Sequence, residues 1–423
     1  SYGFQCCKRK NNKKMKNICF ITSGVLPVPA VKGGAIELLI QQLCEDNEKN
    51  PHFELTVITK KDQSGMAAQQ PYRHTHFENY VQWGGLYHKL AWKARGLMRR
   101  LTGKPFPQFH TYEFQVLQYM KKEGKKFDLV IAEGCDMELM YRISPLLGKD
   151  KVCLHLHCEL FADAQCDNAF GHLIGVSDFV RKAYLSTSKT MPGKKTHVLL
   201  NGVDANRFRK PFPKEEKLVL RHQLGFADDD FVVVFCGRII PVKGVLELMQ
   251  AILKIDNPKI KLLVIGSSDF GNGNLNDYSK KVQKVSLENA DRIVYTGFID
   301  NADLYKYYQL SSIGTVPSLC NEACALVTLE MMHCGLPTIA TKVGGNPELF
   351  TDETTIFIPF DDHVIENLRS NIVRLYENKD LCKQMSEKAL ERATLFTREI
   401  YFSNFCKVIE DILGENNTNS NLL

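Results

Sequence analysis

A basic pair in the run CGRIIPVKG (236–244) has the residue types and spacing of a diphosphate-binding site. Arg238 follows a predicted strand, and Lys243 comes five residues later, at the start of a predicted helix. A guanidinium offers a planar fork and an ammonium a point charge, so the two can converge on charge that is spread over several oxygens. The amino end of the helix, from Gly244, adds backbone N–H groups and a favourable dipole. The alternative is an ordinary strand–turn–helix with solvated basic residues.

Two acidic residues, Glu322 and Glu330, are separated by seven residues in the run NEACALVTLEMMHCG (321–335). Glu322 falls in a loop before a predicted helix, where it stays ionised and can accept hydrogen bonds from sugar hydroxyls. Glu330 lies two turns into the helix and can accept hydrogen bonds from the hydroxyls of a ribose. Its apolar neighbours disfavour the alternative, a solvated surface position. The free N–H groups of the first helical turn suit a phosphate and belong to Ala325, Leu326 and Val327.

Short apolar runs that alternate with helical patterns must position these residues. Bounded by turn residues, they predict buried parallel strands at 17–24, 54–59, 127–134, 151–157, 172–177, 231–239, 261–267, 292–298, 311–318 and 336–341. The pair Gly33–Gly34 follows the first strand, at the end of a parallel sheet where ligands bind. We therefore predict the α/β class, with two Rossmann-like, doubly wound domains that face a central cleft.

The length of 423 residues also favours two domains. We place the first Rossmann-like domain at 15–205 and the second at 206–395. A C-terminal helix within 396–423 is expected to pack back on the first domain, followed by a tail. Residues 1–14 are expected to be a leader outside the folded protein or a disordered arm.

Composition excludes several classes of protein. Hydrophobic residues make up 44% and charged residues 24%, as in soluble chains, and no run of ~18 apolar residues predicts a membrane-spanning helix. The net charge of +6 does not indicate nucleic-acid binding, because residues 1–14 carry five positive charges without an acid. The 14 cysteines lack zinc-site spacing, so we interpret them as mostly buried, reduced thiols of a cytosolic protein.

One segment, 84–104, departs from the α/β pattern and predicts a basic amphipathic helix. Leu86, Leu90, Ala94 and Leu97 can form one face, and lysines and arginines lie around it. Two interpretations stay open: attachment to an anionic membrane beside the acceptor, or a solvated surface helix whose apolar side packs on the first domain.

In their joint order these motifs resemble those of glycosyltransferase family 4. The run from Asn321 to Phe350 is similar to the family's E-x7-E motif and its surroundings. The resemblance covers nearly all of 17 to about 400, and the other matching blocks are Gly33–Gly34, GVSDFVRKAY (175–184), NGVDANRF (201–208), GRIIPVKG (237–244), VIG (264–266) and YTGF (295–298).

The resemblance implies a GT-B fold, with the acceptor on the first domain and a nucleoside-diphosphate sugar on the second, and transfer with retention at the anomeric carbon. Glu322 would bind the donor sugar and Glu330 the ribose. Such enzymes need no metal or other cofactor, because basic residues and the helix dipole neutralise the diphosphate. The other donor-binding positions implied are Arg238 and Lys243 with Gly237 at the diphosphate, Gly33 and Gly34 near the phosphate and sugar, and Phe298 at the base.

A histidine at the end of a strand of the first domain is also part of the resemblance. His155 and His157 are two apart and share a face, so either could reach the cleft. His157 lies nearer the strand's end, which favours it as the histidine that faces the cleft; the alternative is a purely structural histidine.

The chain departs from the family at Cys324–Ala325, where a Phe-Gly pair is usual. This departure leaves the identity of the donor sugar open.

The predicted function is transfer of a sugar, from UDP or another nucleoside diphosphate, to a hydroxyl acceptor. We expect a lipid-linked saccharide of polysaccharide or lipopolysaccharide synthesis, and a protein that is cytoplasmic or peripheral on the inner face of the plasma membrane. A nucleotide-sugar epimerase or sugar phosphorylase on the same scaffold is the rival enzyme. An inactive sugar-binding regulatory subunit is the rival of another class.

Overall fold

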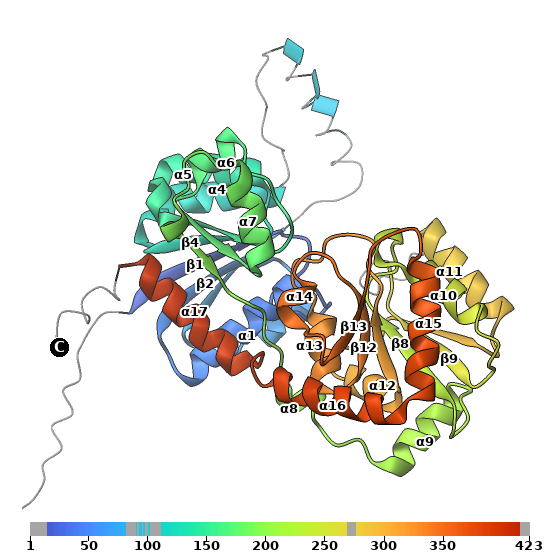
Figure 1. Cartoon of the computed structure of the whole chain (residues 1–423). Helices are drawn as coiled ribbons and strands as arrows, with labels where there is room; N and C mark the ends of the chain where they lie inside the picture. Colours follow the sequence, from blue (N-terminus) through green and yellow to red (C-terminus); the bar gives the residue numbers. More distant parts are fainter. Residues whose placement is uncertain are drawn as a thin grey trace, which may run out of the picture.

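The computed structural model describes residues 15–81, 111–268 and 276–414, together with positions 90, 93, 94, 96, 97, 100 and 101. Two parallel β-sheets with helices packed on them organise this part of the chain (Figure 1). The predicted fold class, two doubly wound α/β domains, is confirmed. None of the described cysteines forms a disulfide, and most of them are buried.

The first sheet has the strand order β3-β2-β1-β4-β5-β6-β7. Its central strands are buried on both faces: Ile18 and Phe20 of β1 pack toward one helix layer, and Cys19 and Ile21 toward the other. The strands span Lys16–Thr22 (β1), Phe53–Lys60 (β2), Thr75–Tyr80 (β3), Leu129–Glu133 (β4), Val152–Leu156 (β5), His172–Gly175 (β6) and Thr196–Val198 (β7). The helices span Ala35–Lys49 (α1), Gln63–Ala68 (α2), Thr111–Glu123 (α4), Met137–Leu147 (α5), Ala164–Ala169 (α6) and Asp178–Thr187 (α7).

The second sheet has the strand order β10-β9-β8-β11-β12-β13. Its strands span Phe231–Cys236 (β8), Ile260–Ile265 (β9), Ile293–Gly297 (β10), Ile313–Val316 (β11), Thr338–Thr341 (β12) and Thr355–Ile358 (β13). The helices span Ala205–Phe208 (α8), Lys214–Gln223 (α9), Val245–Leu253 (α10), Asp277–Glu288 (α11), Leu304–Leu310 (α12), Leu326–His333 (α13), Asn346–Leu349 (α14), Val364–Glu377 (α15), Lys379–Ala393 (α16) and Arg398–Ile412 (α17).

The chain crosses between the two domains twice, and the two crossing segments lie side by side. The Val203 N–H donates to the Phe396 carbonyl at 3.0 Å, and the Arg398 N–H donates to the Val203 carbonyl at 2.9 Å. After the second crossing, α17 returns to the first domain and lies along α1 (Figure 1). Its Phe405 ring lies 5.8 Å from that of Phe20 and 6.0 Å from that of Phe53. The last helix is thus part of the first domain's core.

Candidate active site

The carboxyl ends of the two sheets border a shared cavity of about 730 Å³, a size typical of small-molecule sites. The glycine-rich loop after β1 forms one wall, and loops after β8, β9 and β10 form the other. Eight of the residues predicted for the donor site line it: Gly33, Gly34, Gly237, Arg238, Phe298, Leu326, Val327 and Glu330. The tertiary structure thus brings together positions that are almost 300 residues apart in the chain.

The loop before α1 needs its two glycines for backbone conformation. Gly33 has φ +78° and Gly34 has φ +100°, a region that other residues rarely adopt. A Cβ atom at Gly34 would lie 2.1 Å from an Oε of Glu37. At Gly33 the nearest neighbour of such an atom would be the Phe298 ring of the second domain, at 3.9 Å. The two domains therefore face each other across the cavity at this point.

The basic pair follows β8 as expected, but its two members have different surroundings. Arg238 is exposed and lines the cavity. Lys243 ends a short 3-10 turn, and Gly244, in the left-handed region, precedes the first residue of α10. The Lys243 ammonium lies 2.5 Å from Oε1 of Glu322, an oxygen that also accepts a hydrogen bond from the Ser318 hydroxyl. The two motifs predicted separately from the sequence are thus joined by an ion pair.

Helix α13 positions the acidic residues. Ala325 precedes its first residue, so the first-turn N–H groups have no carbonyl of the same helix to bind. Glu322 lies in the turn ahead of the helix and is 8% exposed, and its carbonyl accepts the Gly345 N–H at 2.6 Å. Glu330 lies one turn into the helix, is 3% exposed and reaches the cavity.

A polar network that was not predicted surrounds Glu330. The Tyr308 hydroxyl donates to one carboxylate oxygen at 2.7 Å, and the Asn301 amide donates to the other at 3.4 Å. Arg207, at the cavity wall, donates to Asn301 in turn. Burial raises the pKa of Glu330, and the two donors and the charge of Arg207 oppose that rise. Arg207 belongs to the block NGVDANRF, which could have drawn attention to it; Tyr308 carries no comparable signal.

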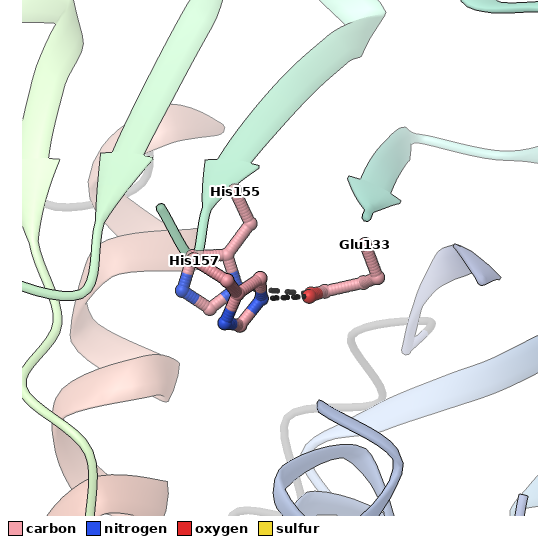
Figure 2. A group of neighbouring side chains, drawn as sticks. All are labelled: Glu133, His155 and His157. Carbon is pink, nitrogen blue, oxygen red and sulfur yellow. Dashed lines mark hydrogen bonds and ion pairs between the residues drawn. The ribbon is translucent and has the colours of Figure 1, made fainter. Parts of the chain in front are cut away.

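His157 does not line the cavity but forms a separate cluster with two other residues of the first domain (Figure 2). Nε2 of His157 lies 2.6 Å from one oxygen of Glu133, and Nδ1 of His155 lies 3.0 Å from the other. Burial acts to raise the pKa of Glu133, but the two imidazoles overcome it and lower the pKa to about 2. Burial and the neighbouring His155 lower the pKa of His157. Sequence reasoning named both histidines and missed the carboxylate between them.

Hydrogen bonds between the two domains join the loops on either side of the cleft. The Glu348 carboxylate of α14 accepts the backbone N–H groups of Asp178 and Phe179, both at 2.7 Å, at the amino end of α7. The Asn321 amide donates to Glu159 of the first domain at 3.0 Å. The segment around Glu322 is therefore held between the two domains.

The predicted amphipathic helix 84–104 lies largely outside the described residues. The described positions within it are helical, and Leu90, Leu97 and Leu101 are exposed by 58%, 59% and 72%. Within the part of the chain that the structure covers, no helix is both long and apolar enough to cross a bilayer.

Comparison with known proteins places this site in a family. Residues 216–392 match the family model "Glycosyl transferases group 1". This range contains the basic pair, both glutamates and Phe298. The chain is a glycosyltransferase.

Relatives of this glycosyltransferase match along almost its whole length. Spore coat protein SA of Bacillus subtilis (strain 168) is 27% identical over 94% of this chain and 98% of its own. Lipopolysaccharide 1,2-N-acetylglucosaminetransferase of Salmonella typhimurium is 25% identical over 89% and 93% of the two chains. The crystal structure of Anabaena HepE in complex with UDP-glucose superposes with a TM-score of 0.71, at 19% identity over 93% of this chain and 99% of that one. The fold is GT-B, as predicted.

Proposed function

We propose that this glycosyltransferase is a retaining enzyme that transfers a sugar from UDP to a hydroxyl of a saccharide or lipid-linked acceptor. The observation that carries the proposal is one cleft lined by Arg238, Glu330 and the first residues of α13. Lys243 and Glu322 do not line the cavity itself, but they form an ion pair with each other next to these elements. A diphosphate there would meet two cations and a helix dipole, and the ribose would meet a buried carboxylate. The relative solved with UDP-glucose supports the choice of nucleotide.

In the proposed reaction the bond between the anomeric carbon and the diphosphate oxygen breaks, and the bond to the acceptor oxygen forms on the same face. The acceptor proton passes to a phosphate oxygen, and the basic groups stabilise the leaving charge. Lys243, proposed for the diphosphate, and Glu322, proposed for the donor sugar, form an ion pair with each other. When the ammonium turns to the diphosphate, Glu322 keeps the Ser318 hydroxyl and gains room for a hydroxyl of the donor sugar.

The test is a panel of nucleotide sugars, scored for slow donor hydrolysis and then for transfer. Arg238→Ala and Lys243→Ala should each abolish turnover in a folded protein, whereas Lys254→Ala, at an exposed lysine beside the same α10, should retain it. Normal turnover in both site variants would overturn the proposal. So would interconversion of the donor without an acceptor, release of sugar phosphate, or binding without any turnover. UDP should bind equally well with and without Mg²⁺, because protein groups neutralise its charge.

We further propose that segment 84–104 attaches the enzyme to an anionic membrane, where a lipid-linked acceptor would lie. The exposed leucines and the basic residues around them support this proposal, because such helices bury an apolar face among anionic headgroups. Arg99→Gln with Arg100→Gln should release the enzyme from anionic vesicles in a sedimentation assay. Lys121→Gln with Lys122→Gln, at the end of α4, is the matched control, and equal release by both pairs would contradict the proposal.

A further inference from the structure

Glu133 is a buried carboxylate that lacks a fixed cationic partner. It ends β4 and is 2% exposed. Among the residues that the structure describes, neither lysine nor arginine forms an ion pair with it; its partners are the imidazoles of His155 and His157. Because a buried charge costs several kcal/mol unless it is compensated, the positive charge must come from an imidazolium or from a bound cation.

The geometry of the cluster suits a metal ion. One nitrogen of each histidine and one oxygen of Glu133 all lie within 4.8 Å of one another, and both imidazole rings turn toward the carboxylate (Figure 2). Tetrahedral Zn²⁺ with bonds of about 2.1 Å would separate its ligand atoms by about 3.4 Å. The two histidine–carboxylate contacts, 2.6 Å to one oxygen and 3.0 Å to the other, are shorter than this, and all three ligand atoms lie within 4.8 Å, so small side-chain rotations would bring them to that spacing.

The backbone explains why these three side chains meet. Strands β4 and β5 are parallel neighbours, and Glu133 is the direct register partner of His155. His157, two residues on, projects from the same face. His157 is 12% exposed, whereas His155 is 3% exposed, so the cluster opens to solvent on the His157 side.

We propose that Glu133, His155 and His157 form a site for one divalent transition-metal ion of the Zn²⁺ class. Two imidazoles and a carboxylate are the ligand set that Zn²⁺ and Co²⁺ favour, and a water molecule would complete a four-coordinate site. None of its three ligands lines the donor cavity, as Arg238 and Glu330 do, although the sequence had placed His157 at the cleft. It is also independent of the proposed function, which needs no metal at the diphosphate.

The second coordination shell limits the expected affinity. When Nδ1 of His155 binds the metal, Nε2 carries the proton, and this buried atom has no protein partner among the described residues. A hydrogen-bond partner for the second nitrogen of a metal-bound histidine typically raises metal affinity by about 10–100-fold. We therefore expect weaker binding than in structural zinc sites.

The experiment uses the full chain without a polyhistidine tag, stripped with a chelator and titrated with Co²⁺. The wild type should bind one Co²⁺ per chain with the visible absorption of a nitrogen- and oxygen-coordinated tetrahedral ion, and Zn²⁺ should displace it. Glu133→Gln should weaken binding by about 100-fold, because a neutral amide oxygen replaces the charged carboxylate that binds the metal directly. His222→Gln, at an exposed histidine 2.6 Å from Asp228, should bind like the wild type.

Three results would overturn the proposal. These are less than one ion per folded chain, equal binding by Glu133→Gln, and intense near-ultraviolet absorption from cobalt–thiolate bonds, which would assign the ion to cysteines. If Glu133→Gln fails to fold, the partly exposed His157→Gln replaces it, and Zn²⁺ should raise the melting temperature of the wild type but not of this variant. None of these readouts depends on sugar transfer, so failure here is separate from failure of the proposed function.

Discussion

Glu330 is hydrogen-bonded by protein donors on both of its carboxylate oxygens, and Tyr308 provides the shorter bond. We expect Tyr308→Phe to weaken UDP binding about tenfold, since a hydrogen bond to a charged group is worth roughly 1.5 kcal/mol. Discrimination against 2′-deoxy-UDP should fall in parallel, because the carboxylate would no longer be held toward the ribose. Calorimetry with both nucleotides measures the two effects.

Tyr307→Phe, on the same α12, is the control for this variant. Tyr307 is half-buried and lies outside the cavity lining, so its loss should leave both nucleotide affinities unchanged. Equal nucleotide affinities in Tyr308→Phe and the wild type would show that Glu330 is positioned by the helix alone.

His333, at the end of α13, makes the fold sensitive to acid. Burial and nearby Arg209 lower its pKa from 6.5 to about 4, against the opposing effects of the Phe396 carbonyl, Asp204 and Glu399. Because the unfolded state binds the proton more readily, the free energy of unfolding is unaffected above pH 6.5 and falls as the pH approaches 4. By pH 5 the loss should be about 2 kcal/mol. Burial also lowers the pKa values of His157, His172 and His197, so some acid destabilisation should remain in any variant of His333. Urea denaturation at pH 7.5 and 5 should therefore show a loss about 2 kcal/mol larger in the wild type than in His333→Gln; equal losses would refute the assignment.

Two loops of the second domain support each other at the site. The loop after β12 passes so close to the turn before α13 that a Cβ atom at Gly344 would lie 2.2 Å from the Glu322 carbonyl oxygen. Gly344→Ala should therefore displace Glu322 and reduce turnover at least tenfold. Gly225→Ala is the matched control, since Gly225 also has positive φ, +81°, but has no atom within 4 Å of the added methyl group. An equal reduction of turnover in the two variants would mean that backbone strain at the substituted glycine, and not the contact with Glu322, lowers turnover.

The whole molecule depends on the return of α17 to the first domain. Arg398 begins this helix, is 7% exposed, and lies 2.9 Å from both Asp46 and Glu45 of α1. Arg398→Met leaves Asp46 buried with less compensation and should lower the free energy of unfolding by about 3 kcal/mol. Chemical denaturation measures the loss. Arg369→Met, which breaks an exposed pair with Glu366, should leave stability nearly unchanged, and an equal loss in both would contradict the role of α17.

Much of the architecture was predictable from local patterns. The apolar runs around β1 and β8 are long enough for strands buried on both faces, and a parallel sheet then follows from the alternation with helices. The cavity residues Arg238 and Glu330 were named because charge type and position at a strand or helix end are properties of the chain itself. For the same reason, the pairing of His155 with His157 on one face followed from strand periodicity.

Other features depend on contacts between segments that are distant along the chain, and no local pattern encodes those contacts. The pairing of Lys243 with Glu322 joins residues 79 positions apart, and Tyr308 reaches Glu330 from a neighbouring helix. Glu133 gained its significance only when strand register set it beside His155. Residue type, charge and periodicity thus specified the two sheets and the residues proposed to bind the donor. Packing of remote elements specified which of these residues touch, because burial and register arise only once the sheets have formed.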